Sequence, residues 1–131
     1  MIYWLPAVLY MAAIFVASSL PDLGPLPGDV SDKSAHSVAY AGLGVLVLYA
    51  LARGRIEGVT SRRAVLAVAI SILYGMSDEW HQSFVPGRTA DWADVLADAV
   101  GAVLGVTLVG AVVALRAWGI LRASARQRRA P

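Results

Sequence analysis

The sequence predicts an all-α membrane protein: a single domain, residues 1–131, folded as a bundle of four transmembrane helices with both termini in the cytoplasm. Hydrophobic residues make up 58% of the chain and charged residues only 15%, against about 45–50% and about 25% in soluble domains. The apolar residues fall into four long runs. A soluble domain of this length could not bury four helices that are apolar all round.

Each apolar run approaches the roughly 20 residues that a helix needs to cross a bilayer. The first run, residues 2–20, has no charged residue, and the Pro- and Gly-rich segment 21–31 follows it as a loop. A cleaved signal peptide is the alternative, but the run lacks a basic n-region and is too long for an h-region, so we expect it to be retained. The remaining spans are expected at about 35–52, 64–84 and 94–118, followed by a basic tail at 119–131.

The basic residues give the orientation. Nine of the eleven lie in the loop between the second and third spans, at the end of the fourth span or after it. They are Arg53, Arg55, Arg62, Arg63, Arg116, Arg122, Arg126, Arg128 and Arg129. The positive-inside rule places these segments in the cytoplasm and the acidic loops outside. No nucleic-acid-binding motif accompanies the arginines, so we expect the lipid bilayer as a partner and no nucleic acid.

Three polar segments are predicted to meet at the outer end of the bundle. In the first, Asp32, His36 and Tyr40 are spaced i, i+4, i+8 and therefore share one helical face, with Lys33 beside them. Asp32 could also cap the helix, because aspartate is a favoured N-cap residue.

The second polar segment ends the third span. Asp78 and Glu79 are adjacent there, and Gln82 shares a face with each of them at i+4 and i+3. Two carboxylates at the end of a span are costly unless they are paired or hydrated. We therefore expect them to have polar partners.

The third polar segment begins with a tight turn at Val-Pro-Gly-Arg, residues 85–88. Asp91, Asp94 and Asp98 then follow on one helical face. Gly101 and Gly105 continue at similar spacing and form a small-residue stripe that lets a neighbouring helix approach closely.

Charges within a membrane usually face the bundle interior or a water-filled cavity. The sequence therefore predicts one shared site at the outer surface. Its expected binding residues are Asp32, Lys33, Tyr40, Gln82, Arg88, Asp91, Asp94 and Asp98. The alternative is a salt-bridged polar cluster that only holds the helices together.

The order of these motifs resembles that of the VanZ-like family over about residues 2–115. The motifs are Asp32-Lys33-x-x-His36 with Tyr40, Ser77-Asp78-Glu79-x-His81-Gln82, Pro86-Gly87-Arg88, Asp91-x-x-Asp94 and Gly101. The family often has asparagine where this chain has Asp98. The resemblance implies a small multi-pass protein of the bacterial inner membrane, with some relatives linked to teicoplanin-type glycopeptide resistance. It implies a role at the cell envelope but supplies no settled reaction or substrate.

Two functions remain open at the predicted site. An enzyme acting on an envelope lipid or precursor would use Glu79, Asp78 and His36 as acid–base residues, with His36 as the proton partner of Glu79. Arg88 or Lys33 would then hold an anionic head group. A non-enzymatic accessory protein would need only a polar pocket that binds a lipid, a precursor or a glycopeptide. No nucleophile motif decides between them.

A metal site is a further alternative, since the polar segments offer oxygen and imidazole ligands for a divalent ion. The residues considered are Asp32, His36, Asp78, Glu79 and His81. They come from different spans and form no H-E-x-x-H pairing, so we expect neither a metal ion nor another cofactor. The chain has no cysteine, which excludes thiolate ligands and disulfides. The glycine stripe would permit an oligomer.

Overall fold

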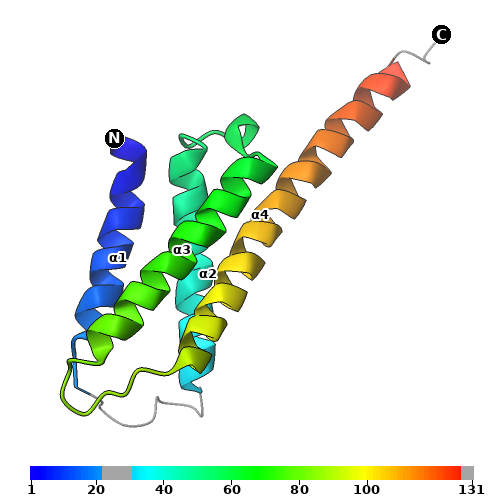
Figure 1. The fold of residues 1–131 in the computed structure, drawn as a ribbon. Helices are drawn as coiled ribbons and strands as arrows, with labels where there is room; N and C mark the ends of the chain where they lie inside the picture. Colours follow the sequence, from blue (N-terminus) through cyan, green and yellow to red (C-terminus); the bar gives the residue numbers. More distant parts are fainter. Residues whose placement is uncertain (22–30, 128–131) are drawn as a thin grey trace.

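The computed structural model describes residues 1–21 and 31–127, and that part of the chain contains helices and no strand. The elements are η1 (Ile2–Trp4), α1 (Leu5–Ser18), α2 (Asp32–Leu51), η2 (Ile56–Gly58), α3 (Ser61–Gln82) and α4 (Trp92–Gln127) (Figure 1). The predicted all-α class is confirmed. Each α-helix coincides with one of the four apolar runs.

The main difference from the predicted boundaries lies at the end of α4. This helix continues to Gln127, through much of the segment expected to be a basic tail. Alanine, leucine, arginine and glutamine, which are strong helix formers, dominate that segment, and no proline interrupts it before Gln127. Figure 1 shows α4 extending past the ends of the other helices.

Side-chain caps begin two of the helices. Ser31 is the N-cap of α2 and accepts a hydrogen bond from the backbone N–H of Ser34 at 3.2 Å. Asp32, considered above as the cap, is instead the first residue of the helix, where its negative charge complements the helix dipole. Thr60 caps α3 in the same way, with the N–H of Arg63 as donor at 3.3 Å.

The tight turn at residues 85–88 is confirmed. The N–H of Arg88 donates to the carbonyl oxygen of Val85 at 3.1 Å, and Gly87 has a φ of 81°. Proline followed by a glycine with positive φ is the pattern of a type II turn. The turn returns the chain from α3 to the start of α4.

The helices lie side by side, and the start of α1 and the end of α4 are at the same end of the bundle (Figure 1). The N-terminal ends of α2 and α4 and the C-terminal end of α3 form the opposite end. We call this opposite end the polar end, because it holds all three predicted polar segments.

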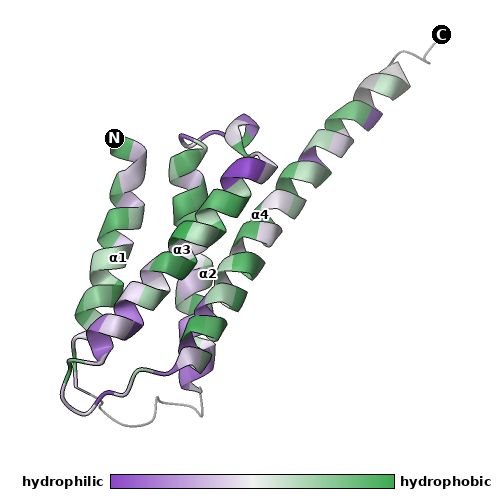
Figure 2. Cartoon of the chain, in the orientation of Figure 1, coloured by the Kyte–Doolittle hydropathy of each residue, from purple (hydrophilic) through white to green (hydrophobic). Residues whose placement is uncertain are grey.

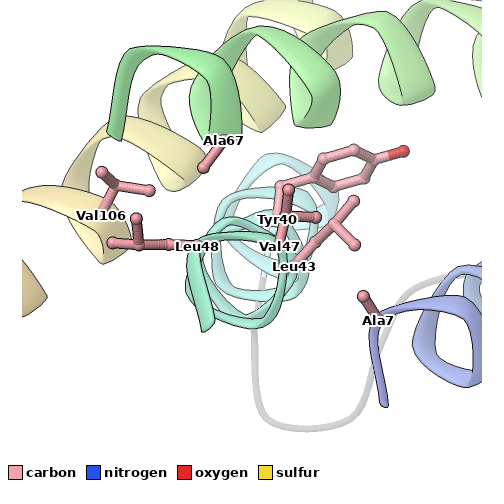
Figure 3. Packing of buried hydrophobic residues seen from close by; sticks show 7 residues of the cluster. All are labelled: Ala7, Tyr40, Leu43, Val47, Leu48, Ala67 and Val106. Atoms are coloured by element: carbon pink, nitrogen blue, oxygen red, sulfur yellow. The ribbon is translucent and has the colours of Figure 1, made fainter. Parts of the chain in front are cut away.

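Helix α2 lies at the centre and contacts each of the other three helices, α4 most extensively. The apolar core consists of Ala7, Tyr40, Leu43, Val47, Leu48, Ala67 and Val106, contributed by all four helices (Figure 3). Beyond the core, glycines bring α2 and α4 together, as predicted. Gly101 and Gly105 of α4 lie directly against the carbonyl groups of Ser37 and Ala41, leaving no room for a side chain.

The distribution of hydropathy suggests a membrane protein. Hydrophobic residues occupy the middle of the four helices, and hydrophilic residues gather towards the ends (Figure 2). Large apolar side chains are exposed on the outside of the bundle, among them Val38, Leu73, Leu104 and Leu108. Soluble monomers rarely expose apolar surface on this scale, whereas lipid covers it in a membrane.

Two helices are long and apolar enough to cross a membrane, namely α2 and the Trp92–Arg122 part of α4. The segment Ile2–Ser18 is apolar but shorter. Helix α3 does not meet the same criteria, since charged and polar residues occupy both of its ends. The four-span count and the positions of the termini therefore remain predictions.

Candidate functional site

The polar end contains an unusual concentration of buried polar side chains. Less than a tenth of each of these residues is exposed, although their side chains carry charges or amides. They are Asp78, Glu79, Gln82, Asp94 and Asp98. Side chains of this kind are rarely buried unless they have partners. The partners come from neighbouring helices.

The pairing of His36 with Asp98 joins α2 to α4. The Nδ1 atom of His36 lies 2.9 Å from Oδ1 of Asp98, which is only 1% exposed. Gly75 of α3 faces the same carboxylate, and a Cβ atom there would approach Oδ2 of Asp98 to 2.7 Å. The structure thus gives His36 a partner in Asp98, where the sequence interpretation had paired it with Glu79.

Lys33 forms a second link between these helices. Its Nζ atom donates to Oδ2 of Asp91 at 3.2 Å and to Oδ1 of Asp94 at 3.3 Å. Oδ1 of Asp91 accepts a hydrogen bond from the N–H of Ala93 at 2.8 Å. This N–H and, secondarily, the Lys33 ammonium hold the pKa of Asp91 below its ordinary value of 3.8. Lys33 is therefore already occupied by carboxylates.

The two carboxylates of α3 are also fully partnered. Gln82 donates through Nε2 to Oδ2 of Asp78 at 3.2 Å and to Oε1 of Glu79 at 3.3 Å, as the spacing predicts. The hydroxyl of Ser18 donates to Oδ1 of Asp78 at 2.7 Å. The backbone N–H of Asp91 donates to Oε2 of Glu79 at 2.9 Å.

Ser18 is the site residue that the sequence interpretation missed. It is buried, and it links α1 to Asp78 across the bundle. The available signal was a hydroxyl near the end of an otherwise apolar run, at the same end as the acidic segments. Serines are common in such positions, and nothing in the sequence distinguishes this one from Ser19 beside it.

The site residues do not line a single pocket. Asp78 borders a cavity of about 240 Å³ between α1, α2 and α3, which we call the inner cavity. Glu79 borders a separate groove of about 340 Å³ beside α4. Asp78 and Glu79 therefore border different cavities, although both accept a hydrogen bond from Gln82. The predicted site residues are thus divided between two cavities.

The inner cavity is lined by both polar and apolar side chains. Its residues are Ile14, Ala17, Ser18, Asp32, Ala35, His36, Ala39, Tyr40, Asp78, Gln82 and Arg88. Six of the predicted site residues therefore border this cavity: Asp32, His36, Tyr40, Asp78, Gln82 and Arg88. Lys33 lies at the surface, and Glu79 borders the groove instead. The groove is mostly apolar and is lined by Met76, Glu79, Trp80, Ser83, Ala90, Asp91, Trp92 and Val95.

Tyr40 is the most unusual residue of the inner cavity. It is only 1% exposed, and its hydroxyl has no hydrogen-bond partner in the described part of the chain. The ring packs with the apolar core, and the hydroxyl points away from Val47 and Leu48 (Figure 3). A buried hydroxyl of this kind normally has a partner, because losing its hydrogen bonds to water costs about 1–3 kcal/mol.

Arg88 brings a positive charge to the same cavity. Its guanidinium donates to the carbonyl oxygens of Leu20 at 3.2 Å and of Ala17 at 3.5 Å, near the end of α1. Within residues 1–21 and 31–127 it forms no ion pair with a carboxylate. The predicted role of Arg88 as a clamp for an anion is therefore compatible with its position.

Only two of the five residues considered as metal ligands, Asp32 and His36, come close together. One ligand atom from each lies within 4.8 Å of a carboxylate oxygen of Asp94, which was not among the five. His81 turns away towards α1, where its Nε2 atom lies 3.0 Å from the Ser19 hydroxyl and its ring stacks on Phe15. Asp78 and Glu79, described above, are also outside the group.

The comparisons with known proteins address the family. A family model described as VanZ/LLP1 matches residues 4–114, which is most of the chain and nearly the extent of the resemblance noted above. A search of curated proteins found no match, and a search of solved structures also found none. Because the family model covers far more than half of the chain, the chain belongs to the VanZ/LLP1 family.

Proposed function

We propose that the chain is a multi-pass protein of the bacterial inner membrane that binds the polar head group of an envelope lipid or lipid-linked precursor in the inner cavity. In this proposal all four helices cross the bilayer, and the polar end faces outward. The exposed apolar surfaces support the membrane location. The nine arginines in the loop before α3 and in the C-terminal part of the chain support the orientation.

The unpartnered hydroxyl of Tyr40 is the observation that carries this proposal. The hydroxyl itself is buried, so a ligand in the inner cavity would supply the missing hydrogen bond after a small shift of the side chains that cover it. Arg88 and Gln82 border the same cavity and offer further donors to an oxygen-rich group. With a volume of about 240 Å³, the cavity suits a head group better than a complete lipid with its acyl chains.

A role at the envelope is consistent with the family. VanZ-like proteins are often linked to glycopeptide resistance, and glycopeptides act outside the cytoplasmic membrane. A site that holds a lipid or precursor head group on that side would alter what the antibiotic encounters. A head group in this cavity would also lie beside Asp78 and His36, the two acid–base candidates that border it.

The test compares two tyrosines on the same bundle. Tyr40→Phe keeps the ring and removes the unpartnered hydroxyl, so we expect unchanged or higher stability together with loss of head-group binding. Tyr74→Phe is the matched control, because the Tyr74 hydroxyl already donates to the carbonyl of Met11 at 2.6 Å. We expect it to cost about 1 kcal/mol of stability and to leave binding intact.

Binding is measured by native mass spectrometry of purified variants with envelope lipid extract. Envelope lipidomics and teicoplanin susceptibility are measured in a deletion strain that carries each variant. Retained lipid binding in Tyr40→Phe would overturn the proposal. A change in one lipid class that requires Asp78, Glu79 or His36 would add catalysis, whereas resistance without such a change would favour an accessory protein.

A purely structural role is the second candidate, and one observation favours it. Ser18, Asp78, Gln82 and Glu79 form a continuous chain of hydrogen bonds that ends at the N–H of Asp91. This chain joins α1 and α3 to the start of α4. If it serves only to hold the bundle, Glu79→Gln will lower stability and any loss of phenotype will follow the loss of folded protein.

A further inference from the structure

We infer that the groove between the end of α3 and the start of α4 binds the ammonium group of a lipid head group. The groove has a volume of about 340 Å³ and shares no lining residue with the inner cavity, so it would be a second site. The inference rests on the membrane location proposed above, but it does not depend on a head group in the inner cavity.

The charges that line the groove are all negative. Glu79 and Asp91 border it, and the described residues of its lining include no lysine, arginine or histidine. The inner cavity differs in this respect, because Arg88 and His36 border it. The groove therefore suits a ligand with a positive charge.

Glu79 is a buried carboxylate without a charged partner. It is 5% exposed, and its two oxygens accept hydrogen bonds from the Gln82 amide at 3.3 Å and from the backbone N–H of Asp91 at 2.9 Å. An N–H donor at each oxygen suits an ionised carboxylate, which can only accept.

No cation of the described chain compensates this charge. Both donors to Glu79 are neutral, and within residues 1–21 and 31–127 it takes part in no ion pair. The ammonium of Lys33 contacts Asp91 and Asp94 instead. A buried charge is costly unless an opposite charge lies beside it. A cationic ligand in the groove would supply that charge.

Two tryptophans indicate what kind of cation this is. Trp80 and Trp92 line the same groove and are 70% and 74% exposed. Cations are attracted to the faces of aromatic rings, to tryptophan most strongly, and organic ammonium groups are often recognised in this way. Tryptophans beside carboxylates therefore favour an organic ammonium group over a hydrated metal ion.

The rest of the groove is mostly apolar, with Met76, Ala90 and Val95 among its lining residues. A small soluble amine would leave these side chains in contact with water. A lipid offers an ammonium group and apolar surface in one molecule. The occupant that fits both properties is a lipid whose head group ends in a primary ammonium, as an ethanolamine head group does.

The test changes the charge of the lipid and leaves the protein intact. Native mass spectrometry of the full chain, purified in detergent, compares dioleoyl phosphatidylethanolamine with its N-acetyl derivative, in which the ammonium has become a neutral amide. We expect the ammonium lipid to bind about tenfold more tightly. Equal affinities for the two lipids would overturn the inference.

Variants of the groove should remove this preference. Glu79→Gln keeps the size of the side chain and should abolish the preference for the ammonium lipid. Trp80→Leu and Trp92→Leu should each weaken binding of that lipid by about threefold. Because both tryptophans are exposed, these two variants keep the test decisive if Glu79→Gln does not fold, which circular dichroism verifies.

Two controls use the same residue types outside the groove. Glu57→Gln changes the other glutamate of the chain, and Trp118→Leu changes an exposed tryptophan in the C-terminal part of α4. Both should keep the preference of the unmodified chain. An equal loss in Trp118→Leu would mean that the tryptophans only anchor the chain at the membrane surface, and the inference would fail.

Two further measurements identify the source of the ammonium group and separate the two sites. Free ethanolamine at the same concentration should not displace the lipid, and equal competition would overturn the assignment to a lipid. The N-acetyl lipid lacks the charge that the groove recognises, so its binding reports on the inner cavity. Its loss in Tyr40→Phe tests the proposed function, whereas the preference for the ammonium lipid tests the groove, and either can fail alone.

Discussion

Asp98 is the most deeply buried carboxylate of the polar end, and its hydrogen bond to His36 is the shortest polar link between α2 and α4 side chains. Asparagine at this position would retain a carbonyl oxygen as an acceptor for the His36 N–H. We therefore expect the oxygen atom of Asp98 to matter more to the stability of the fold than its charge.

Substitutions at Asp98 should separate these two properties. We expect Asp98→Asn to change the free energy of unfolding by less than about 1 kcal/mol, because the hydrogen bond to His36 remains. Asp98→Ala should cost about 2–4 kcal/mol, because it leaves His36 without its partner and opens a cavity beside Gly75. Titration with sodium dodecyl sulfate, followed by circular dichroism, measures both values. Equal losses in the two variants would show that the charge itself is required.

Gly87 is the residue of the 85–88 turn whose backbone conformation favours glycine over residues with a side chain. Its φ of 81° is in the region that side chains disfavour, although a Cβ atom would meet no neighbour within 4 Å. Gly87→Ala should therefore cost about 1 kcal/mol through backbone strain alone. Gly119→Ala, a helical position with equally open space, is the control and should not destabilise the chain. The same detergent titration compares the two.

At the scale of the helices, the sequence was most informative about the close contact between α2 and α4. The spacing of Gly101 and Gly105 predicts a small-residue stripe, and the structure places these glycines against backbone carbonyl groups of α2. The end of α4 was predicted less well. Hydrophobicity falls after Trp118, whereas helix propensity continues, and a helix outside an apolar run is governed by propensity.

Enlarging the glycines at this contact should force the two helices apart. A Cβ atom on Gly101 would overlap the carbonyl group of Ser37, which is backbone and cannot move away by a rotamer change. We expect Gly101→Ala to lose about 1–3 kcal/mol of stability. Gly110→Ala on the same helix meets nothing within 4 Å and should gain up to about 1 kcal/mol from higher helix propensity. Equal unfolding midpoints for the two variants would contradict this packing.

At the scale of the whole molecule, the sequence predicted which residues lie together at the polar end. It did not predict which helix each of them contacts or which of the two cavities it borders. Helical spacing correctly places Gln82 against both Asp78 and Glu79. It does not show which neighbouring helix each carboxylate faces, because this depends on the rotation of α3 within the bundle. For the same reason the sequence did not indicate that His36 meets Asp98, or that Ser18 meets Asp78. Such pairings depend on tertiary packing and have no local signal.

Helix α3 is the element on which the proposed topology depends, because its hydropathy alone does not identify it as a span. The loops at its two ends provide a direct test, since the chain has no cysteine of its own. Glu57 and Thr89 are both exposed, one before α3 and one after it. If the arginine-rich loop is cytoplasmic, a membrane-impermeant maleimide should label Thr89→Cys in intact cells and Glu57→Cys only after permeabilisation. Labelling of both positions in intact cells would mean that α3 does not cross the bilayer. Labelling of Glu57→Cys alone in intact cells would mean that the polar end faces the cytoplasm.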